Sequence, residues 1–118
     1  MPALDTVGQY LTEARRLLQD ETVPYRYPDA DLVDALNIAL MEARRLRADL
    51  FLNAFNLPFF DPDAIVPETA VPMDPMYRSS LVYYIVGRAQ LRDDEPTTDQ
   101  RAGALIQKFT AQLLTIAS

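Results

Sequence analysis

Apolar side chains recur three and four positions apart in four stretches of the chain. This spacing places them on one face of an α-helix, so each stretch predicts an amphipathic helix. The helices are expected at about residues 3–19, 29–52, 75–93 and 97–116. Prolines interrupt the chain in each of the three connections. The pattern therefore predicts one all-α domain over residues 1–118, folded as a four-helix bundle.

The charges along the second predicted helix agree with its direction. Asp29 and Asp31 stand at its start, where the helix dipole is positive, and Arg44, Arg45 and Arg47 stand near its end, where the dipole is negative. The simpler interpretation of the arginines is a solvated helix face that complements the dipole. The other is the binding of a phosphate or a carboxylate through bidentate hydrogen bonds. Given the net charge of −6, an acidic protein surface fits this second interpretation better than DNA does.

The third predicted helix is apolar on nearly every side. Residues 81–86 form an unbroken apolar run that a buried strand could also explain. Helical composition and spacing continue through Arg88 and Leu91, so a helix is predicted. A helix that is apolar all round must be covered on nearly all sides. We therefore expect other subunits to cover part of it.

Residues 53–76 combine five prolines with many apolar side chains. Proline removes backbone donors and restricts φ, so this segment is predicted to be an extended arm between the second and third helices, with room for short strand pairing at its edges. At roughly 24 residues it is far longer than an ordinary connection. Its apolar side chains need a surface to cover, and we expect a neighbouring subunit or another protein to provide it. The expected interface residues are Leu57, Phe59, Phe60, Ile65, Val66, Val71, Met73, Met76 and Tyr77.

The composition excludes many kinds of active site. The chain has no cysteine and no histidine, which rules out disulfides, Cys/His zinc sites, thiol nucleophiles and imidazole acid–base catalysis. No stretch is long enough to span a bilayer, and the start of the chain lacks the pattern of a signal peptide. These features predict a soluble intracellular protein with no membrane partner. The acidic net charge argues against general nucleic-acid binding.

Two acidic groups contain oxygen ligands of the kind that calcium and magnesium prefer, Asp61 with Asp63 and the run at residues 93–95. Neither has the spacing and the glycine of a calcium-binding loop. Loop and cap chemistry accounts for both, so no metal, cofactor or catalytic residue is expected.

Two blocks of the chain resemble the head–tail connector, or adaptor, proteins of tailed bacteriophages. Residues 25–51 resemble the start of their second helix, through an aromatic residue, two acidic residues and a Leu–x–x–x–Leu–Asn sequence that ends at Asn37. Residues 71–91 are similar to their third helix, and residues 102–114, with Phe109, to their last. The resemblance covers nearly the whole chain and contains no catalytic motif.

The resemblance implies a structural virion protein that docks in a ring, commonly of twelve copies, beneath the portal after DNA packaging. The ring extends the DNA channel and joins the head to the tail. The implied partners are the portal protein, a tail or nozzle protein and further copies of this chain, while DNA passes through without sequence-specific binding. The implied location is the neck of the virion, and the host cytoplasm during assembly. Many relatives carry a β-hairpin where this chain has its prolines, so hairpin contacts are not transferred.

Two other functions stay open at this point. An all-α, metal-free enzyme of the chorismate-mutase kind would bind an anionic small molecule through Arg44 and Arg47, with Glu42 as its carboxylate. A helical interaction module would instead use residues 53–76 to bind one folded partner. A structural protein without catalysis is the leading interpretation, because the most unusual feature of the sequence is its apolar, proline-rich segment.

Overall fold

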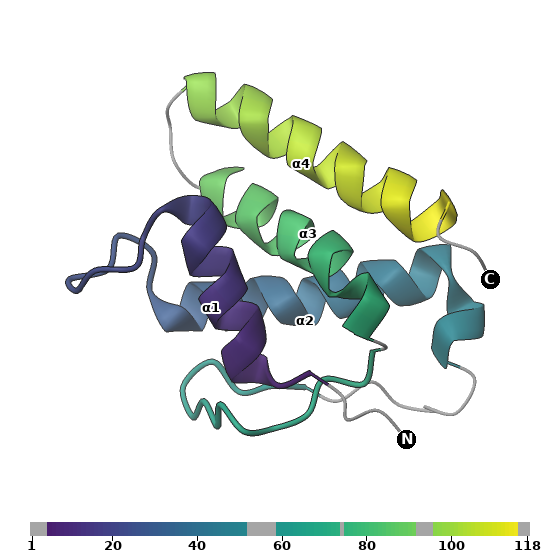
Figure 1. The fold of residues 1–118 in the computed structure, drawn as a ribbon, viewed down its shortest axis with the longest axis horizontal. Helices are drawn as coiled ribbons and strands as arrows, with labels where there is room; N and C mark the ends of the chain where they lie inside the picture. Colours follow the sequence, from purple (N-terminus) through teal and green to yellow (C-terminus); the bar gives the residue numbers. More distant parts are fainter. Residues whose placement is uncertain (1–4, 52–58, 74, 92–95, 116–118) are drawn as a thin grey trace.

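A computed structural model describes residues 5–51, 59–73, 75–91 and 96–115. These residues are all-helical, as predicted, with no β-strand among them (Figure 1). The four α-helices are α1 (Val7–Leu18), α2 (Asp29–Leu46), α3 (Arg78–Leu91) and α4 (Pro96–Thr115). Two short 3₁₀ helices, η1 (Ala48–Phe51) and η2 (Pro75–Tyr77), follow α2 and precede α3.

Local chemistry sets the ends of α1 and α2. Thr6 caps α1 in a capping box, in which the Gln9 N–H donates to the Thr6 hydroxyl and the Thr6 N–H donates to the Gln9 side chain at 2.8 Å. The α-helix at α2 ends at Leu46, earlier than the predicted residue 52, because Arg47 leaves helical geometry with φ −137° and ψ 70°. The chain then continues in the tighter turns of η1.

Helix α3 is the centre of the molecule. Figure 1 shows it between α4 on one side and α1 and α2 on the other, and it packs against all three. Leu81, Ile85 and Val86 are completely buried as a result. The expectation that other subunits cover this apolar helix is therefore wrong, because the other helices of the same chain cover it.

A glycine allows α4 to lie close to α3. A β-carbon placed on Gly87 would stand 2.7 Å from Cγ1 of Ile106 and 3.0 Å from the carbonyl oxygen of Ala102, both on α4. Two carbon atoms at optimal separation lie about 3.5–4.0 Å apart. One turn away, the rings of Tyr84 and Phe109 meet edge to face, with centroids 4.8 Å apart. The α3–α4 interface is thus closely packed around a position without a side chain.

The described part of the proline-rich segment, residues 59–73, lies along the start of α1. The backbone N–H groups of Val7 and Gly8, which have no partner within the helix, donate to the carbonyls of Thr69 and Pro67, each at 2.9 Å. Strand-like pairing in the described residues is limited to one antiparallel bridge between Thr6 and Ala70.

A buried amide fixes the other end of this loop. The Asn37 side chain accepts from the Phe60 N–H at 3.0 Å and donates to the Phe60 carbonyl at 2.8 Å. Both backbone groups of a buried residue are therefore satisfied by a single side chain of α2.

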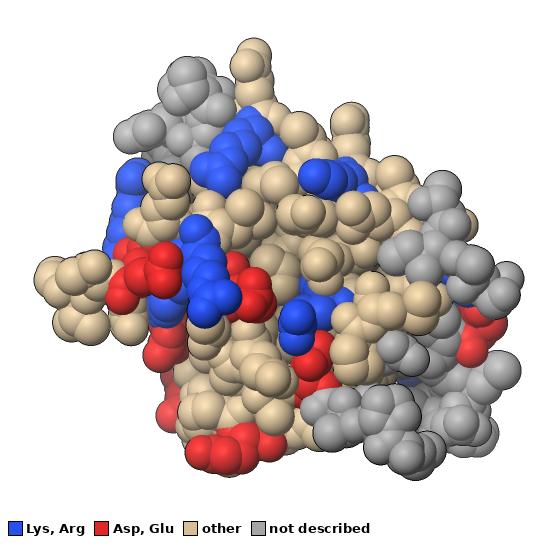
Figure 2. Space-filling model, in the orientation of Figure 1, with Lys and Arg blue, Asp and Glu red and all other residues tan. Residues whose placement is uncertain are grey.

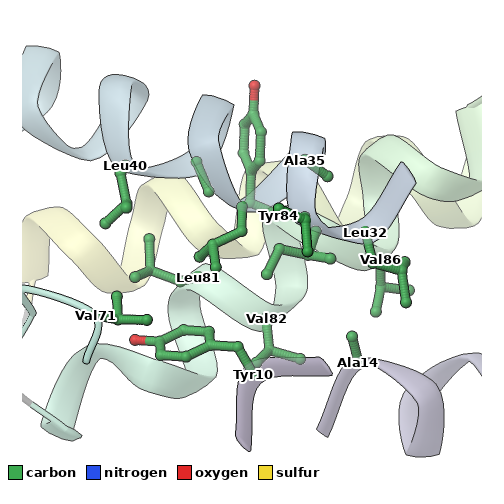
Figure 3. Packing of buried hydrophobic residues seen from close by; sticks show 14 of the residues in the cluster. Tyr10, Ala14, Leu32, Ala35, Leu40, Val71, Leu81, Val82, Tyr84 and Val86 are labelled. Carbon is green, nitrogen blue, oxygen red and sulfur yellow. The ribbon is translucent and has the colours of Figure 1, made fainter. Parts of the chain in front are cut away.

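The hydrophobic core combines side chains of the helices and of the loop. Figure 3 shows side chains of α1, α2 and α3 converging with Val71 of the loop; those labelled are Tyr10, Ala14, Leu32, Ala35, Leu40, Val71, Leu81, Val82, Tyr84 and Val86. Because Val71 is buried among helical side chains, the loop is part of the fold and not an appendage to it.

Candidate interaction surfaces

The structure divides the expected interface residues into buried and exposed sets. Phe60, Val71, Met73 and Tyr77 are buried in the protein's own core, so their assignment to an interface is wrong. Ile65 is half-buried against that core. The physical reason is that the loop folds back on α1 and α2, where their apolar side chains find partners within the chain. Leu57 lies outside the described residues.

Three of the expected interface residues do present large apolar surfaces to solvent. The exposed fractions are 73% for Phe59, 56% for Val66 and 56% for Met76. Phe59 and Val66 also line a pocket of about 230 Å³, whose other apolar walls include Val7 and Val33. An exposed phenylalanine beside an apolar hollow is a surface suited to protein contact.

Acidic side chains accompany these apolar groups. Asp61 holds a turn, because its carboxylate accepts from the Asp63 N–H at 2.9 Å. Asp61, Asp63 and Glu68 are all exposed. We call the exposed set the loop surface; its members are Phe59, Asp61, Asp63, Val66 and Glu68.

The arginines at the end of α2 are engaged within the chain. Arg45 donates twice to Glu42, at 3.1 and 2.8 Å, and Arg47 forms a bidentate pair with Asp49 at 2.9 and 2.8 Å. The hydrogen bond between Arg47 and Asp49 raises the pKa of the arginine and lowers the pKa of the carboxyl.

Arg47 also links α2 to the end of α4, since its guanidinium donates to the Leu113 carbonyl at 2.9 Å. Arg44 is exposed on the surface of α2. Four cavities in the described part of the chain are lined by other residues, and neither these three arginines nor Glu42 lines any of those four. Arg45 and Arg47 instead point their guanidinium groups at carboxylates of the same chain.

Arg15 organises a buried polar cluster that the sequence did not indicate. Its guanidinium is buried and donates to Asp20 and to the Tyr27 carbonyl, each at 3.0 Å, and also to Asp29. It lies 3.6 Å from the centre of the Tyr25 ring, a cation–π contact. This cluster holds the connection between α1 and α2 against the helices.

Asp20 is the acceptor at the centre of this cluster. Burial by itself would raise the pKa of Asp20, but the Arg26 and Tyr27 N–H donors and the Arg15 guanidinium together lower it. The carboxylate is therefore held in its charged form.

A second surface, also unexpected from the sequence, lies between α1 and α3. A groove of about 320 Å³ is lined by Glu13, Arg16, Leu17, Arg78, Ser79, Val82 and Tyr83, and we call it the α1/α3 groove. Helical periodicity shows which residues share a face of α1 or of α3. It does not show which faces of the two helices meet, so the groove could not be found from the sequence.

Basic side chains surround this groove. Lys108 of α4 lies over the Tyr83 ring at 4.6 Å, and Arg101 donates to the Leu17 carbonyl at 2.9 Å. Figure 2, in the orientation of Figure 1, shows basic side chains over α1 and over α4, with a hollow between them. Acidic side chains also lie on this face (Figure 2), but beside the groove itself the basic side chains Arg16, Arg78, Arg101 and Lys108 outnumber the acidic ones.

Two kinds of site bear on catalysis, a metal site and an activated serine. The described residues contain no group of three or more acidic residues placed to hold a metal ion. Ser79 lies in the groove, but the chain has no histidine to activate it. No helix in the described part of the chain is long and apolar enough to cross a membrane.

Comparisons of the chain with known protein families, with curated proteins and with solved structures found no match.

Proposed function

We propose that this protein is a head–tail connector subunit: a four-helix bundle whose proline-rich segment makes contacts between subunits, and which forms a ring under the portal of a tailed bacteriophage. The ring extends the DNA channel and joins the head to a tail or nozzle protein. In this proposal the protein has no catalytic activity and acts in the neck of the virion after assembly in the host cytoplasm.

The observation that carries the proposal is the apolar exposure of the loop surface. Phe59 is 73% exposed and lines a largely apolar pocket, so most of its ring is not packed within the monomer. Covering these side chains on assembly would remove apolar area from water, at about 25 cal/mol for each Å². This supports contact with another protein surface, and the sequence resemblance suggests the portal and neighbouring subunits as the partners.

Four of the nine expected interface residues are buried, which narrows the region available for contact. Phe60, Val71 and Met73 serve the core, so only the outward part of residues 59–73 is available to a partner. Residues 59–73 therefore contribute a loop that is packed on the helices, and only its outward side is offered to a partner. Residues 52–58 lie outside the described residues.

The acidic charge of the chain is compatible with a DNA channel. A ring of subunits that each carry −6 would repel the phosphates and let the duplex slide without sticking. Electrostatic mapping of the assembled ring tests this point, and a lumen lined by arginine and lysine would contradict it.

The test of the proposal is to mix the purified protein with the portal protein of the same phage and to image the products by negative stain. Wild-type protein should add a ring of density to one end of the portal. The double variant Phe59→Ser/Val66→Ser should keep its helical circular dichroism, because both side chains are exposed, and should lose the added ring.

Val23→Ser is the matched control, because Val23 is 72% exposed but lies in the connection between α1 and α2. It should bind the portal as the wild type does. If the wild-type protein adds no density to the portal, or if the Phe59/Val66 variant binds normally, the proposal fails.

A further inference from the structure

The α1/α3 groove has the features of a site for an acidic protein segment. Leu17 and Val82 give it apolar walls, and Arg16 and Arg78 give it positive charge. At about 320 Å³ it can receive a few side chains of another protein.

The charges at the groove are only partly neutralised within the chain. Arg16 pairs with Glu13 at 3.3 Å and Arg78 pairs with Asp5 at 3.1 Å. Lys108 and Arg101 contact an aromatic ring and a backbone carbonyl, and neither forms an ion pair with a carboxylate of the described residues. Glu68 adds a third carboxylate nearby, because it lines an adjoining cavity together with Glu13 and Arg78. Four cations and three carboxylates among the described residues leave an excess of one positive charge that a partner carboxylate can use.

The loop surface is the chemical complement of this groove. It has three exposed carboxylates and two exposed apolar side chains, and no lysine or arginine occurs anywhere between Arg47 and Arg78. Its apolar members, Phe59 and Val66, match the apolar walls of the groove.

We propose that the loop surface of one copy docks in the α1/α3 groove of a second copy. Carboxylates of Asp63 and Glu68 then face the cations around the groove, while Val66 packs toward its apolar walls. Two copies that each carry −6 repel one another in most orientations, so the contact between an acidic loop and a basic groove selects the productive one. The contact pairs two unlike surfaces and can therefore repeat around a ring.

This contact rests on the proposed function in one respect, that the protein assembles with copies of itself. Beyond the proposed function, it specifies the two surfaces that meet between copies. It also assigns a role to Lys108, which the sequence did not single out as a contact.

A cysteine cross-link tests the contact directly, because the natural chain has no cysteine. One variant carries Ala64→Cys, at an exposed position of the loop, and a second carries Ser79→Cys, at an exposed position of the groove. The two variants, given tags of different mass, are mixed and mildly oxidised, both alone and with the portal protein. We expect the yield of the cross-linked heterodimer to exceed the yield of either homodimer, either in the sample without the portal protein or in the sample with it.

The control pairs Ser79→Cys with Val23→Cys, because Val23 is also exposed but lies in the connection between α1 and α2. This pair should form no excess of heterodimer. Equal yields from the Ala64→Cys and Val23→Cys pairs, or no heterodimer with either sample, would overturn the proposed contact.

Charge reversal provides a second measurement that does not depend on cross-linking geometry. When Ala64→Cys and Ser79→Cys are cross-linked, Arg16→Glu/Lys108→Glu in the groove copy should lower the yield about tenfold, and Asp63→Lys/Glu68→Lys in the loop copy should do the same. Combining the two reversals restores opposite charges and should recover the yield. Failure of the combined reversal to recover it contradicts the pairing of these surfaces.

The two proposals can fail separately. A ring on the portal without the cross-link between positions 64 and 79 refutes the groove contact and leaves the connector function standing. A cross-link between free copies that never bind the portal supports the contact and refutes the connector function.

Discussion

Helices α3 and α4 approach closely at Gly87. We therefore expect an alanine at this position to lower the stability of the protein, although alanine in place of glycine usually raises the stability of a helix. Replacing glycine by alanine within a helix normally stabilises it by about 0.5–1 kcal/mol, because alanine loses less backbone freedom on folding. Gly87 lies in the interior of α3, so the normal expectation would be a more stable protein. We expect Gly87→Ala to be less stable than the wild type.

The magnitude follows from the contacts of the added methyl group. It would stand 2.7 Å from the Ile106 side chain and 3.0 Å from the Ala102 carbonyl oxygen, each well inside ordinary contact distance. A rotamer change can move Ile106, but the Ala102 carbonyl belongs to the backbone of α4, so the helix itself must shift. Overpacking of this kind costs about 1–3 kcal/mol. After the gain in helix propensity of about 0.5–1 kcal/mol is subtracted from the middle of this range, a net loss of about 1 kcal/mol is expected.

Gly103→Ala on α4 is the matched control. A β-carbon there meets nothing within 4 Å, so the same substitution should stabilise the protein by about 0.5–1 kcal/mol. The two variants should therefore move the free energy of unfolding in opposite directions.

Urea unfolding monitored by circular dichroism measures both variants against the wild type. A double variant, Gly87→Ala with Ile106→Ala, tests the assigned contact, because removing the Ile106 side chain should reduce the cost of the added methyl group. If Gly87→Ala stabilises the protein as Gly103→Ala does, the close approach of α3 and α4 is refuted.

Two further predictions concern buried polar groups. Asp20→Ala should lower the free energy of unfolding by about 3 kcal/mol, because the buried Arg15 guanidinium loses one of its carboxylate partners. The pKa of Asp20 is lower in the folded state, so its ionised form stabilises the fold fully above the ordinary aspartate pKa of about 3.9. This stabilisation is lost as the pH falls through the folded pKa. Asp20→Asn should therefore lose less stability in acid than the wild type, as measured by urea unfolding between about pH 5 and pH 2. Asn37→Ala should cost about 2–3 kcal/mol, because it leaves the buried N–H and carbonyl of Phe60 without a partner. It should also speed limited proteolysis within residues 59–69, and an unchanged cleavage rate would show that Asn37 does not hold the loop.

The helices were predictable because their signals are local. Apolar periodicity placed all four, and the predicted ends agree with the structure to within a few residues, except at α2. There the sequence pattern runs on through Leu50, whereas the α-helix stops at Leu46 and η1 follows. The break falls at Arg47, whose side chain is bound to Asp49 and to the Leu113 carbonyl, and the second of these contacts is distant in sequence.

The candidate surfaces were only partly predictable. The proline-rich segment is irregular and apolar, as its composition predicts, but the choice among its side chains was not local information. Whether Val71 or Val66 is buried depends on which one meets α1 and α2, and alternation of proline and apolar residues does not specify this. The α1/α3 groove was missed altogether, because Arg16 and Arg78 are far apart in the chain and come together only when two helices pack.

By itself, the sequence determined that this protein is all-helical, that it lacks the residues for thiol, imidazole and disulfide chemistry, and that an apolar, proline-rich segment separates two pairs of helices. These properties follow from residue type and short-range spacing. Tertiary structure decided that α3 is covered by its own chain, that Phe60, Val71 and Met73 complete the core, and that a basic groove accompanies an acidic loop. The physical reason is that burial and surface charge depend on which segments meet, and a hydrophobic side chain has no preference of its own between a neighbour in the same chain and one in another.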